Sequence, residues 1–148
     1  MAKSSQLGDI PGARFHQPAV VQVSSVASGG ATGRIGQFGP FALDIRFRNV
    51  WYSPTSGDQS STQTATYRRL SLFNGGTSGT ATAAASRMAS LNLSASQASL
   101  GAAAFAVDTT QTLASGQIAY FSQDTVGGID ANGTVLQAGY FSVAYEVV

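Results

Sequence analysis

The sequence predicts an all-β fold, a single β-sandwich or jelly-roll-like domain with an extended N-terminal arm. Three observations lead to this prediction. Several short runs alternate apolar and polar residues with a period of two, clusters of Gly, Ser and Asn separate these runs, and no strand–helix alternation is present. A chain of 148 residues fits one domain, and we assign residues 1–17 to the arm and residues 18–148 to the domain.

The arm and the first strand are distinguished by composition. Residues 1–17 mix Gly, Pro and charged residues with few periodic apolar positions, which is typical of a segment that becomes ordered on binding. The β-branched run within residues 19–26 predicts the first strand. Gly33 and Gly36 follow without forming a nucleotide-binding motif, so we interpret them as turn residues.

The clearest strand signal covers residues 41–51. Apolar side chains recur there at every second position from Phe41 to Trp51, with only Asn49 breaking the row, and charged side chains occupy positions between them. This pattern predicts one buried face and one charged face. Turn-forming residues then predict a surface loop over residues 53–61.

The middle of the chain is ambiguous between strand and helix. Residues 64–73 read as a strand that ends at an Asn-Gly-Gly turn. An alanine-rich helical stripe competes with period-two alternation over residues 81–107. We favour strands around residues 87–95 and 102–107, and a short helix inside 95–103 is compatible with the pattern.

Two further strands complete the predicted fold. Residues 118–121 form one, and a turn signal at residues 130–133 precedes the final apolar run over residues 135–148. Both faces of this last run are apolar, so we expect it to lie centrally in a sheet or between subunits.

The charge content is low and argues for assembly with other proteins. Only 10% of the residues are charged, against about 25% in an ordinary domain. Ser and Thr together outnumber the charged residues, and a surface of this kind is buried against a neighbour at lower cost. A net charge of +1 predicts no nucleic-acid partner, and the absence of a long apolar stretch predicts no membrane association.

The residues needed for catalysis or metal binding are scarce. The chain has no cysteine and a single histidine, His16, which has no Ser-His-Asp or metal-ligand spacing around it. Most of the aspartates fall in predicted loops, where Asp is a common turn residue. We therefore expect no catalytic residue, no cofactor and no metal, and we expect Glu146 on the last strand to pair with an arginine.

Two arginine pairs are candidate interface residues. Arg46 and Arg48 project from the polar face of the clearest strand, and Arg68 and Arg69 lie in another. Across paired strands they could meet Asp44 or the acidic residues of a neighbouring subunit. A solvated sheet face is an equally good interpretation.

Aromatic residues and the arm supply the other interface candidates. Trp51 and Tyr52 are suited to an interface anchor, to a sugar-stacking platform or to ordinary core packing. Within the arm, we select Arg14, Phe15 and His16 as candidates for contact with a partner.

The charge-poor, cysteine-free strands behind an N-terminal arm resemble virion proteins of tailed bacteriophages. Residues 67–76 and 139–145 are typical of that group. Among such proteins, capsid decoration (cement) proteins match best in length and in the short arm. The resemblance implies a non-enzymatic structural protein on the capsid surface of the virion, bound to the major capsid protein or another virion protein and assembled as a homo-oligomer, with a trimer favoured.

Under that interpretation, the arm would lace neighbouring subunits together, and stability would come from apolar area buried at many symmetric contacts. The alternative is a carbohydrate-binding or receptor-binding β-sandwich module, such as a head-fibre or tail-fibre knob, that uses Trp51, Tyr52 and nearby loops.

Overall fold

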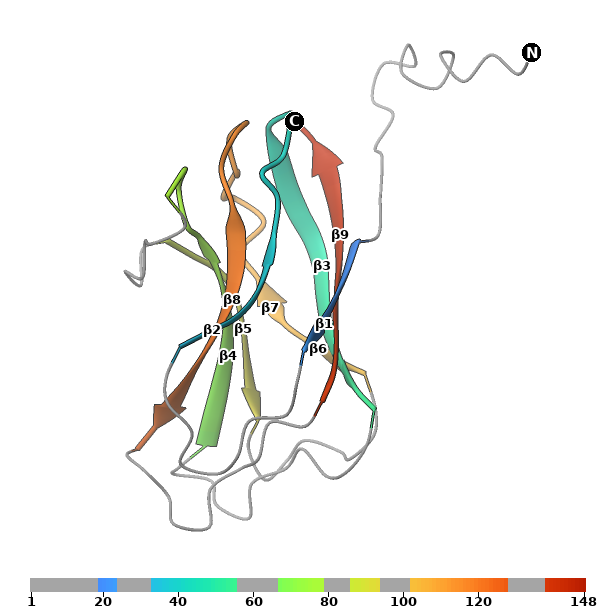
Figure 1. Cartoon of the computed structure of the whole chain (residues 1–148), viewed down its shortest axis with the longest axis vertical. Coiled ribbons are helices and arrows are strands. Elements are labelled where there is room, and N and C mark those ends of the chain that lie inside the picture. Colours follow the sequence, from blue (N-terminus) through green and yellow to red (C-terminus); the bar gives the residue numbers. More distant parts are fainter. Residues whose placement is uncertain (1–18, 24–32, 56–66, 79–85, 94–101, 128–137) are drawn as a thin grey trace, which may run out of the picture.

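The computed structural model describes residues 19–23, 33–55, 67–78, 86–93, 102–127 and 138–148, and for residues 19–23 it describes the backbone alone. The predicted arm over residues 1–17 lies outside these ranges. The described residues form β-strands and no α-helix (Figure 1). The strands are β1 (Ala19–Val23), β2 (Gly33–Phe38), β3 (Ile45–Pro54), β4 (Tyr67–Asn74), β5 (Arg87–Leu93), β6 (Ala103–Ala104), β7 (Ala106–Val107), β8 (Ala119–Val126) and β9 (Gly139–Val147).

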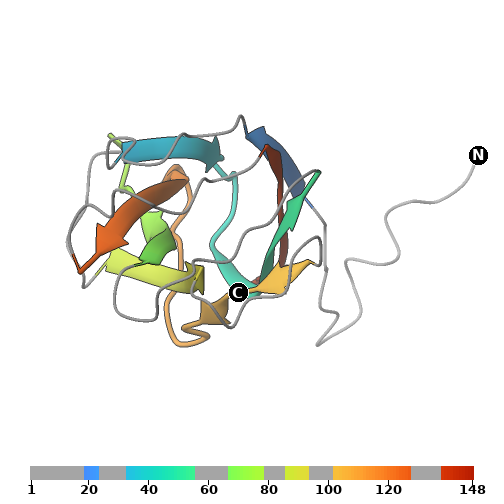
Figure 2. The ribbon, with the colours of Figure 1, turned by 90° about the horizontal axis from the view of Figure 1, so that it is seen from below.

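The strands form two antiparallel sheets, which confirms the prediction of an all-β fold. One sheet has the order β1-β9-β3-β6 and the other has the order β2-β8-β4-β5-β7. Figure 2 shows the two sheets on opposite sides of a shared interior. The strand pairs are nested along the chain, because β1 pairs with β9, β2 with β8, β3 with β6, and β4 with β5.

Aromatic side chains from both sheets meet in the centre of the core. The rings of Phe121 on β8 and Phe141 on β9 stack with their centroids 3.8 Å apart and their planes 7° from parallel. Phe105 packs edge-on against both, at 5.8 Å and 6.1 Å. One continuous cluster of buried apolar residues therefore holds the two sheets together.

A short segment passes from one sheet to the other and closes one side of the molecule. Ala103 and Ala104 pair with β3, while Ala106 and Val107 pair with β5. Phe105, between these two pairs, points inward and is 6% exposed. Its N–H donates to the Val50 carbonyl at 2.9 Å, which fixes the crossing to β3. The prediction of strand structure over residues 102–107 is confirmed.

The strand predicted over residues 41–51 begins and ends later than expected. Strand β3 starts at Ile45, because the segment before it is held by residues 113–117 instead of by a neighbouring strand. The Asp44 carboxylate accepts a hydrogen bond from the Ser115 N–H at 2.7 Å, and the Phe41 N–H donates to the Gln117 carbonyl. Strand β3 then continues through Ser53 and Pro54, where a loop was predicted.

The alternation within β3 reverses at a β-bulge, which the sequence pattern did not reveal. The register with β9 shifts between Phe47 and Asn49. Before the bulge Ile45 and Phe47 are buried, and after it Val50 and Tyr52 are buried instead. The expectation that the face of Phe47 also carries Trp51 inward is therefore wrong, because one extra residue moves every later side chain to the other face.

Strand β2 corrects the interpretation of Gly33 and Gly36 as turn residues. Gly33 and Gly36 both lie in β2 and pair with Gln123 and Phe121 of β8. The register shifts between Arg34 and Gly36. Glycine is found at such irregularities within strands as well as in turns, so composition alone misassigned this segment.

The remaining strand predictions are confirmed with shifted ends. Strand β5 matches the strand favoured around residues 87–95, and β8 extends the predicted residues 118–121 to Val126. Strand β9 lies between β1 and β3, as expected for the last apolar run. The turn after β4 also forms, with Gly76 at a φ of 65° and its N–H donating to the Asn74 side chain. Of residues 95–103, where a short helix is compatible with the sequence pattern, residues 95–101 lie outside the described residues and Ala103 begins β6, and the turn at 130–133 also lies outside the described residues.

Candidate functional site

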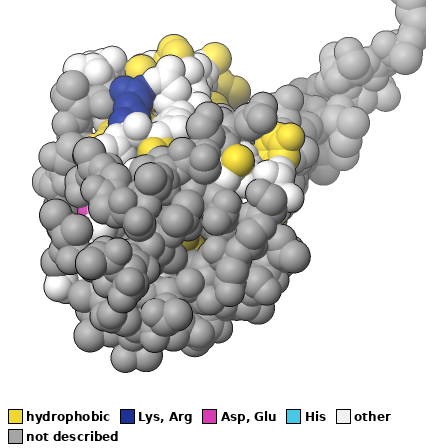
Figure 3. All heavy atoms as spheres, turned by 60° about the horizontal axis from the view of Figure 1, so that its bottom comes forward, with side chains coloured by type: hydrophobic (Ala, Val, Ile, Leu, Met, Phe, Trp, Pro, Cys, Tyr) yellow, Lys and Arg dark blue, Asp and Glu magenta, His cyan; other side chains and the backbone are white. Residues whose placement is uncertain are grey.

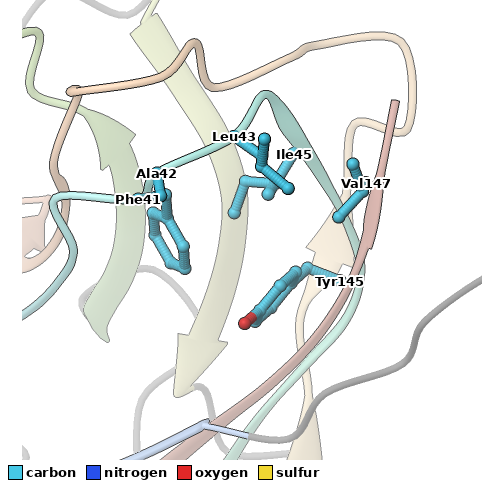
Figure 4. Close-up of a pocket in the computed structure, with 6 residues that line it drawn as sticks. All are labelled: Phe41, Ala42, Leu43, Ile45, Tyr145 and Val147. Carbon is cyan, nitrogen blue, oxygen red and sulfur yellow. The ribbon is translucent and has the colours of Figure 1, made fainter. Parts of the chain in front are cut away.

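An apolar groove lies at the end of the core where β3 begins and β9 ends. It has a volume of about 190 Å³, and Figure 4 shows its side chains converging on one space. The lining residues are Phe41, Ala42, Leu43, Ile45, Tyr145 and Val147. No polar side chain other than the Tyr145 phenol is among them, so the groove is suited to an apolar occupant.

Strand pairing and aromatic packing build the groove. Ile45 on β3 pairs with Val147 on β9, and these two residues form the part of the groove that lies on the strands. Phe41 packs edge-on against Tyr145, with ring centroids 5.2 Å apart, and also against Phe47.

The rim of the groove is exposed. Leu43 is 57% exposed, Val147 is 41% exposed and the terminal Val148 is 52% exposed. Large apolar side chains in the same part of the molecule are thus open to solvent together. Clusters of this kind mark interaction sites more often than isolated apolar side chains do.

A charged cluster lies on the adjacent part of the same two strands. Glu146 is 4% exposed, and Arg48 forms an ion pair with its Oε1. Arg46 Nη1 lies 3.7 Å from the same oxygen. The expectation that Glu146 pairs with an arginine is confirmed, and Arg46 and Arg48 meet this acid instead of Asp44, which bonds to Ser115.

The second arginine pair divides between the two faces of the other sheet. Arg69 pairs with Asp124 on β8 through two hydrogen bonds, one of them 3.0 Å from Nε to Oδ1. These bonds and the nearby charge raise the pKa of Arg69. Arg68 instead points into the core, is 2% exposed and donates to Gln123 Oε1 at 2.5 Å. Burial lowers the pKa of this guanidinium.

A row of cationic and aromatic side chains crosses the outer face of the five-stranded sheet and was missed by sequence reasoning. Arg34 lies 5.4 Å from the centre of the Tyr120 ring, and Tyr120 stacks on Phe73 at 5.5 Å. Arg87 lies 5.5 Å from the Phe73 ring. The four residues come from β2, β8, β4 and β5, so only the strand order brings them together. Burial raises the pKa of Tyr120, and the nearby Arg34 charge partly opposes this.

The two adjacent aromatic candidates have different environments. Tyr52 is fully buried in the core against Phe141, and burial raises the pKa of its phenol. Trp51 projects from the opposite face of β3 and is partly exposed. Within this fold Tyr52 and Arg68 therefore have almost no surface to offer a partner, whereas Trp51 and Arg69 do.

The structure brings some of the candidate residues together and separates others. Arg46 and Arg48 share one acid on one sheet, while Arg69 lies on the other sheet. The arm candidates Arg14, Phe15 and His16 lie outside the described residues. The groove itself was not predicted, because its residues come from two segments far apart in the sequence and the fold alone joins them.

The described residues provide no evident metal site. Within them, no group of three or more His, Cys, Asp or Glu side chains lies close enough to hold a metal ion. Asp108 is fully accounted for by a turn, since hydrogen bonds from Thr110 and Gln111 hold its carboxylate and lower its pKa. Within the same described residues, no helix has the length and apolar character that are needed to span a membrane.

Figure 3 turns the bottom of Figure 1 toward the viewer and shows, among the described residues, one small basic area and several small hydrophobic areas. A scan against models of protein families finds no match for this chain, and a search of curated proteins finds no significant relative. The groove and the charged cluster beside it are therefore assigned on their geometry alone.

Proposed function

We propose that the chain is a jelly-roll domain that serves as a non-enzymatic structural protein of a virus particle. The observation that carries the proposal is the nested strand pairing. In a jelly roll, the first strand pairs with the last, the second with the last but one, and so on inward. Strands β1–β9, β2–β8, β3–β6 and β4–β5 follow this scheme when β6 and β7 are counted as one crossing strand.

The link from fold to role is an analogy with other jelly rolls, which are common in viral capsid proteins and in lectins. The surface supports the first of these roles. The chain is poor in charge, and it exposes Leu43, Val147 and Val148 beside an apolar groove. Contacts repeated across a lattice stabilise it strongly even when each contact is small. We propose a decoration subunit on the capsid surface, acting as a homo-oligomer in which a trimer is favoured.

Labelling of particles tests this proposal directly. Antibodies raised against the purified chain are applied to virus particles from the source of the sequence, and bound antibody is located by gold labelling in the electron microscope. Label on the capsid surface supports decoration, and label on a fibre or tail supports the knob alternative. Particles that carry no label, while the chain is abundant in the particle-free fraction, would overturn a virion role.

A carbohydrate-binding function is the second candidate, and the position of Trp51 favours it. Trp51 lies on the outer face of β3 with part of its side chain exposed, as a sugar-stacking platform requires. A glycan array probed with wild type, Trp51→Ala and Trp51→Phe tests it. Binding that is lost in the alanine variant and kept in the phenylalanine variant would favour a lectin-like role over decoration.

A further inference from the structure

The outer face of the four-stranded sheet carries two accessible aromatic side chains close together. This face points away from the other sheet (Figure 2). Trp51 on β3 pairs with Ser142 on β9, and the next outward position along β9 is Tyr140. Trp51 is partly exposed and Tyr140 is 39% exposed. Because diagonal neighbours of this kind lie about 7–8 Å apart on one face, the indole and the phenol ring can contact one ligand together.

Small side chains surround the two rings, so a flat ligand can reach them. Ala104 on β6 pairs with Trp51 and is exposed. Ser53 pairs with Tyr140, and both Ser53 and Ser142 are partly exposed. Each serine hydroxyl can donate and accept hydrogen bonds beside the rings. A sugar has an apolar ring face and polar edges, and it therefore matches aromatic rings that are bordered by hydroxyl groups.

The charged cluster described above lies on the same face, further along β3 and β9. Arg46 and Arg48 both approach Oε1 of Glu146, and their side chains are 30% and 23% exposed. In the described part of the chain, the two arginines form no other ion pair. Two guanidinium groups thus share one carboxylate, which leaves an excess of positive charge and unused N–H donors that an anion from solution can reach.

The spacing of the rings and the charged cluster sets the size of the ligand. Tyr140 and Glu146 are both outward positions of β9, and a strand rises about 3.3 Å per residue, so they lie about 20 Å apart. This distance is longer than one sugar ring. A ligand that stacks on the aromatic rings and also reaches the arginines is therefore an oligosaccharide.

We propose that this face binds an acidic oligosaccharide, one whose sugars carry carboxylate groups. Trp51 and Tyr140 stack on sugar rings, and Arg46 and Arg48 pair with a carboxylate of the ligand. The excess positive charge beside the rings favours an acidic glycan over a neutral one. The inference rests on the carbohydrate-binding candidate function and names the class of glycan that this function would use.

A glycan array that pairs each acidic glycan with its neutral counterpart tests the class of ligand. The probes are sialylated glycans with their desialylated parents, and galacturonate oligomers with their methyl esters. For at least one pair, we expect the acidic member to bind at least about tenfold more tightly, because only it can pair with the arginines. Equal binding of both members of every pair would overturn the acidic class and leave carbohydrate binding intact, whereas binding of no glycan would overturn both.

A polyglutamate peptide separates an acidic glycan from an acidic protein segment. It carries carboxylates but no sugar ring, so we expect it to bind at least about tenfold more weakly than the best acidic glycan. A peptide that binds as tightly as the glycan would overturn the proposal and indicate a protein partner on this face.

Substitutions on the face show which side chains make the contact. Trp51→Ala and Arg46→Gln should each weaken binding of the acidic glycan about tenfold, through loss of stacking and of a charge-assisted hydrogen bond. Arg46→Gln retains the ion pair of Arg48 with Glu146. If Trp51→Ala is unstable in thermal unfolding, Tyr140→Ala provides the same test at a more exposed ring.

Arg69→Gln is the matched control for charge. It removes one positive charge from a side chain that is 28% exposed and ion-paired, but on the other sheet. We expect its affinity for the acidic glycan to equal that of the wild type. If Arg69→Gln weakens binding as much as Arg46→Gln does, the attraction depends on net charge alone and the assignment of this face is overturned.

Discussion

The two ends of the interior are completed in different ways. Toward the end where β3 finishes, the described core includes buried polar groups, with Arg68 bonded to Gln123 and the Tyr52 phenol in the same interior. At the end where β3 begins, apolar side chains line an open groove. Buried polar groups destabilise the fold unless they have hydrogen-bond partners, whereas exposed apolar groups cost little stability but promote association with other surfaces. Among the described residues, the first end therefore contributes partnered polar groups to the core, and the second exposes apolar side chains.

The largest expected effect is at the polar end. Arg68→Ala leaves Gln123 buried without this donor and empties a large volume, so we expect the free energy of unfolding to fall by about 3 kcal/mol in urea denaturation. Arg69→Ala is the matched control, because that side chain is 28% exposed and its ion pair contributes less than about 1 kcal/mol. Equal effects of the two substitutions would show that Arg68 is not structurally important.

A smaller loss is expected from Gly139→Ala at the start of β9. An added Cβ would lie 2.4 Å from the Ser53 carbonyl oxygen and 2.9 Å from the Pro54 Cα, both of which are backbone atoms. We expect a loss of about 2 kcal/mol in thermal or urea unfolding. Gly33→Ala, where a Cβ would meet nothing within 4 Å, should change stability by less than about 0.5 kcal/mol. If both variants are neutral, the close approach of β9 to β3 is not tight.

The buried Tyr52 phenol predicts a loss of stability at high pH. Burial raises the pKa of Tyr52 in the folded chain above the value of about 10 for an exposed tyrosine. As the pH rises above about 10, the unfolded chain loses this proton first, so stability falls by about 1.4 kcal/mol per pH unit. The stability is fully present below that pH.

Unfolding measured from pH 8 to 11.5 tests this prediction. Tyr52→Phe should remove most of the slope, and Tyr120, whose pKa is also raised, accounts for a remainder. Tyr140→Phe, at a side chain that is 39% exposed, should leave the slope intact. A slope that persists in Tyr52→Phe would assign the effect to another group.

The smallest expected effect on stability is at the groove. Leu43→Ala should change the free energy of unfolding by less than about 0.5 kcal/mol, because more than half of the side chain is exposed. Leu113→Ala, nearby but fully buried, should cost about 3 kcal/mol. A large loss in Leu43→Ala would mean that the groove is part of the folded core and not a contact surface.

The sequence was sufficient to predict the strands whose apolar and polar residues follow a local period of two. Alternation located most of β3, and the doubly apolar run at the end of the chain predicted the central position of β9. The bulge beside Arg48 could not be predicted from the sequence, because an extra residue in one strand is recognised only when the pairing register with the partner strand is known. That one residue moved Trp51 outward and Tyr52 inward.

The candidate site depended on pairing between distant strands, and sequence reasoning resolved it only in part. An arginine partner for Glu146 could be expected because a buried acid on an apolar strand needs one. The partner of Arg69 could not be expected, because Asp124 becomes its neighbour only through the β4–β8 register. The groove likewise joins residues 41–45 to residues 145 and 147, and no local pattern encodes that proximity.

The segment that crosses between the sheets has a consequence for self-association. Ala103 and Ala104 cover the edge of β3, and Ala106 and Val107 cover the edge of β5. Exposed strand edges are templates for aggregation. Two residue pairs protect the edge of β3, and two more, on the other side of Phe105, protect the edge of β5. Release of this one segment would expose two adhesive edges at once, so the inward packing of Phe105 guards the chain against fibrillar misassembly as well as contributing to its core.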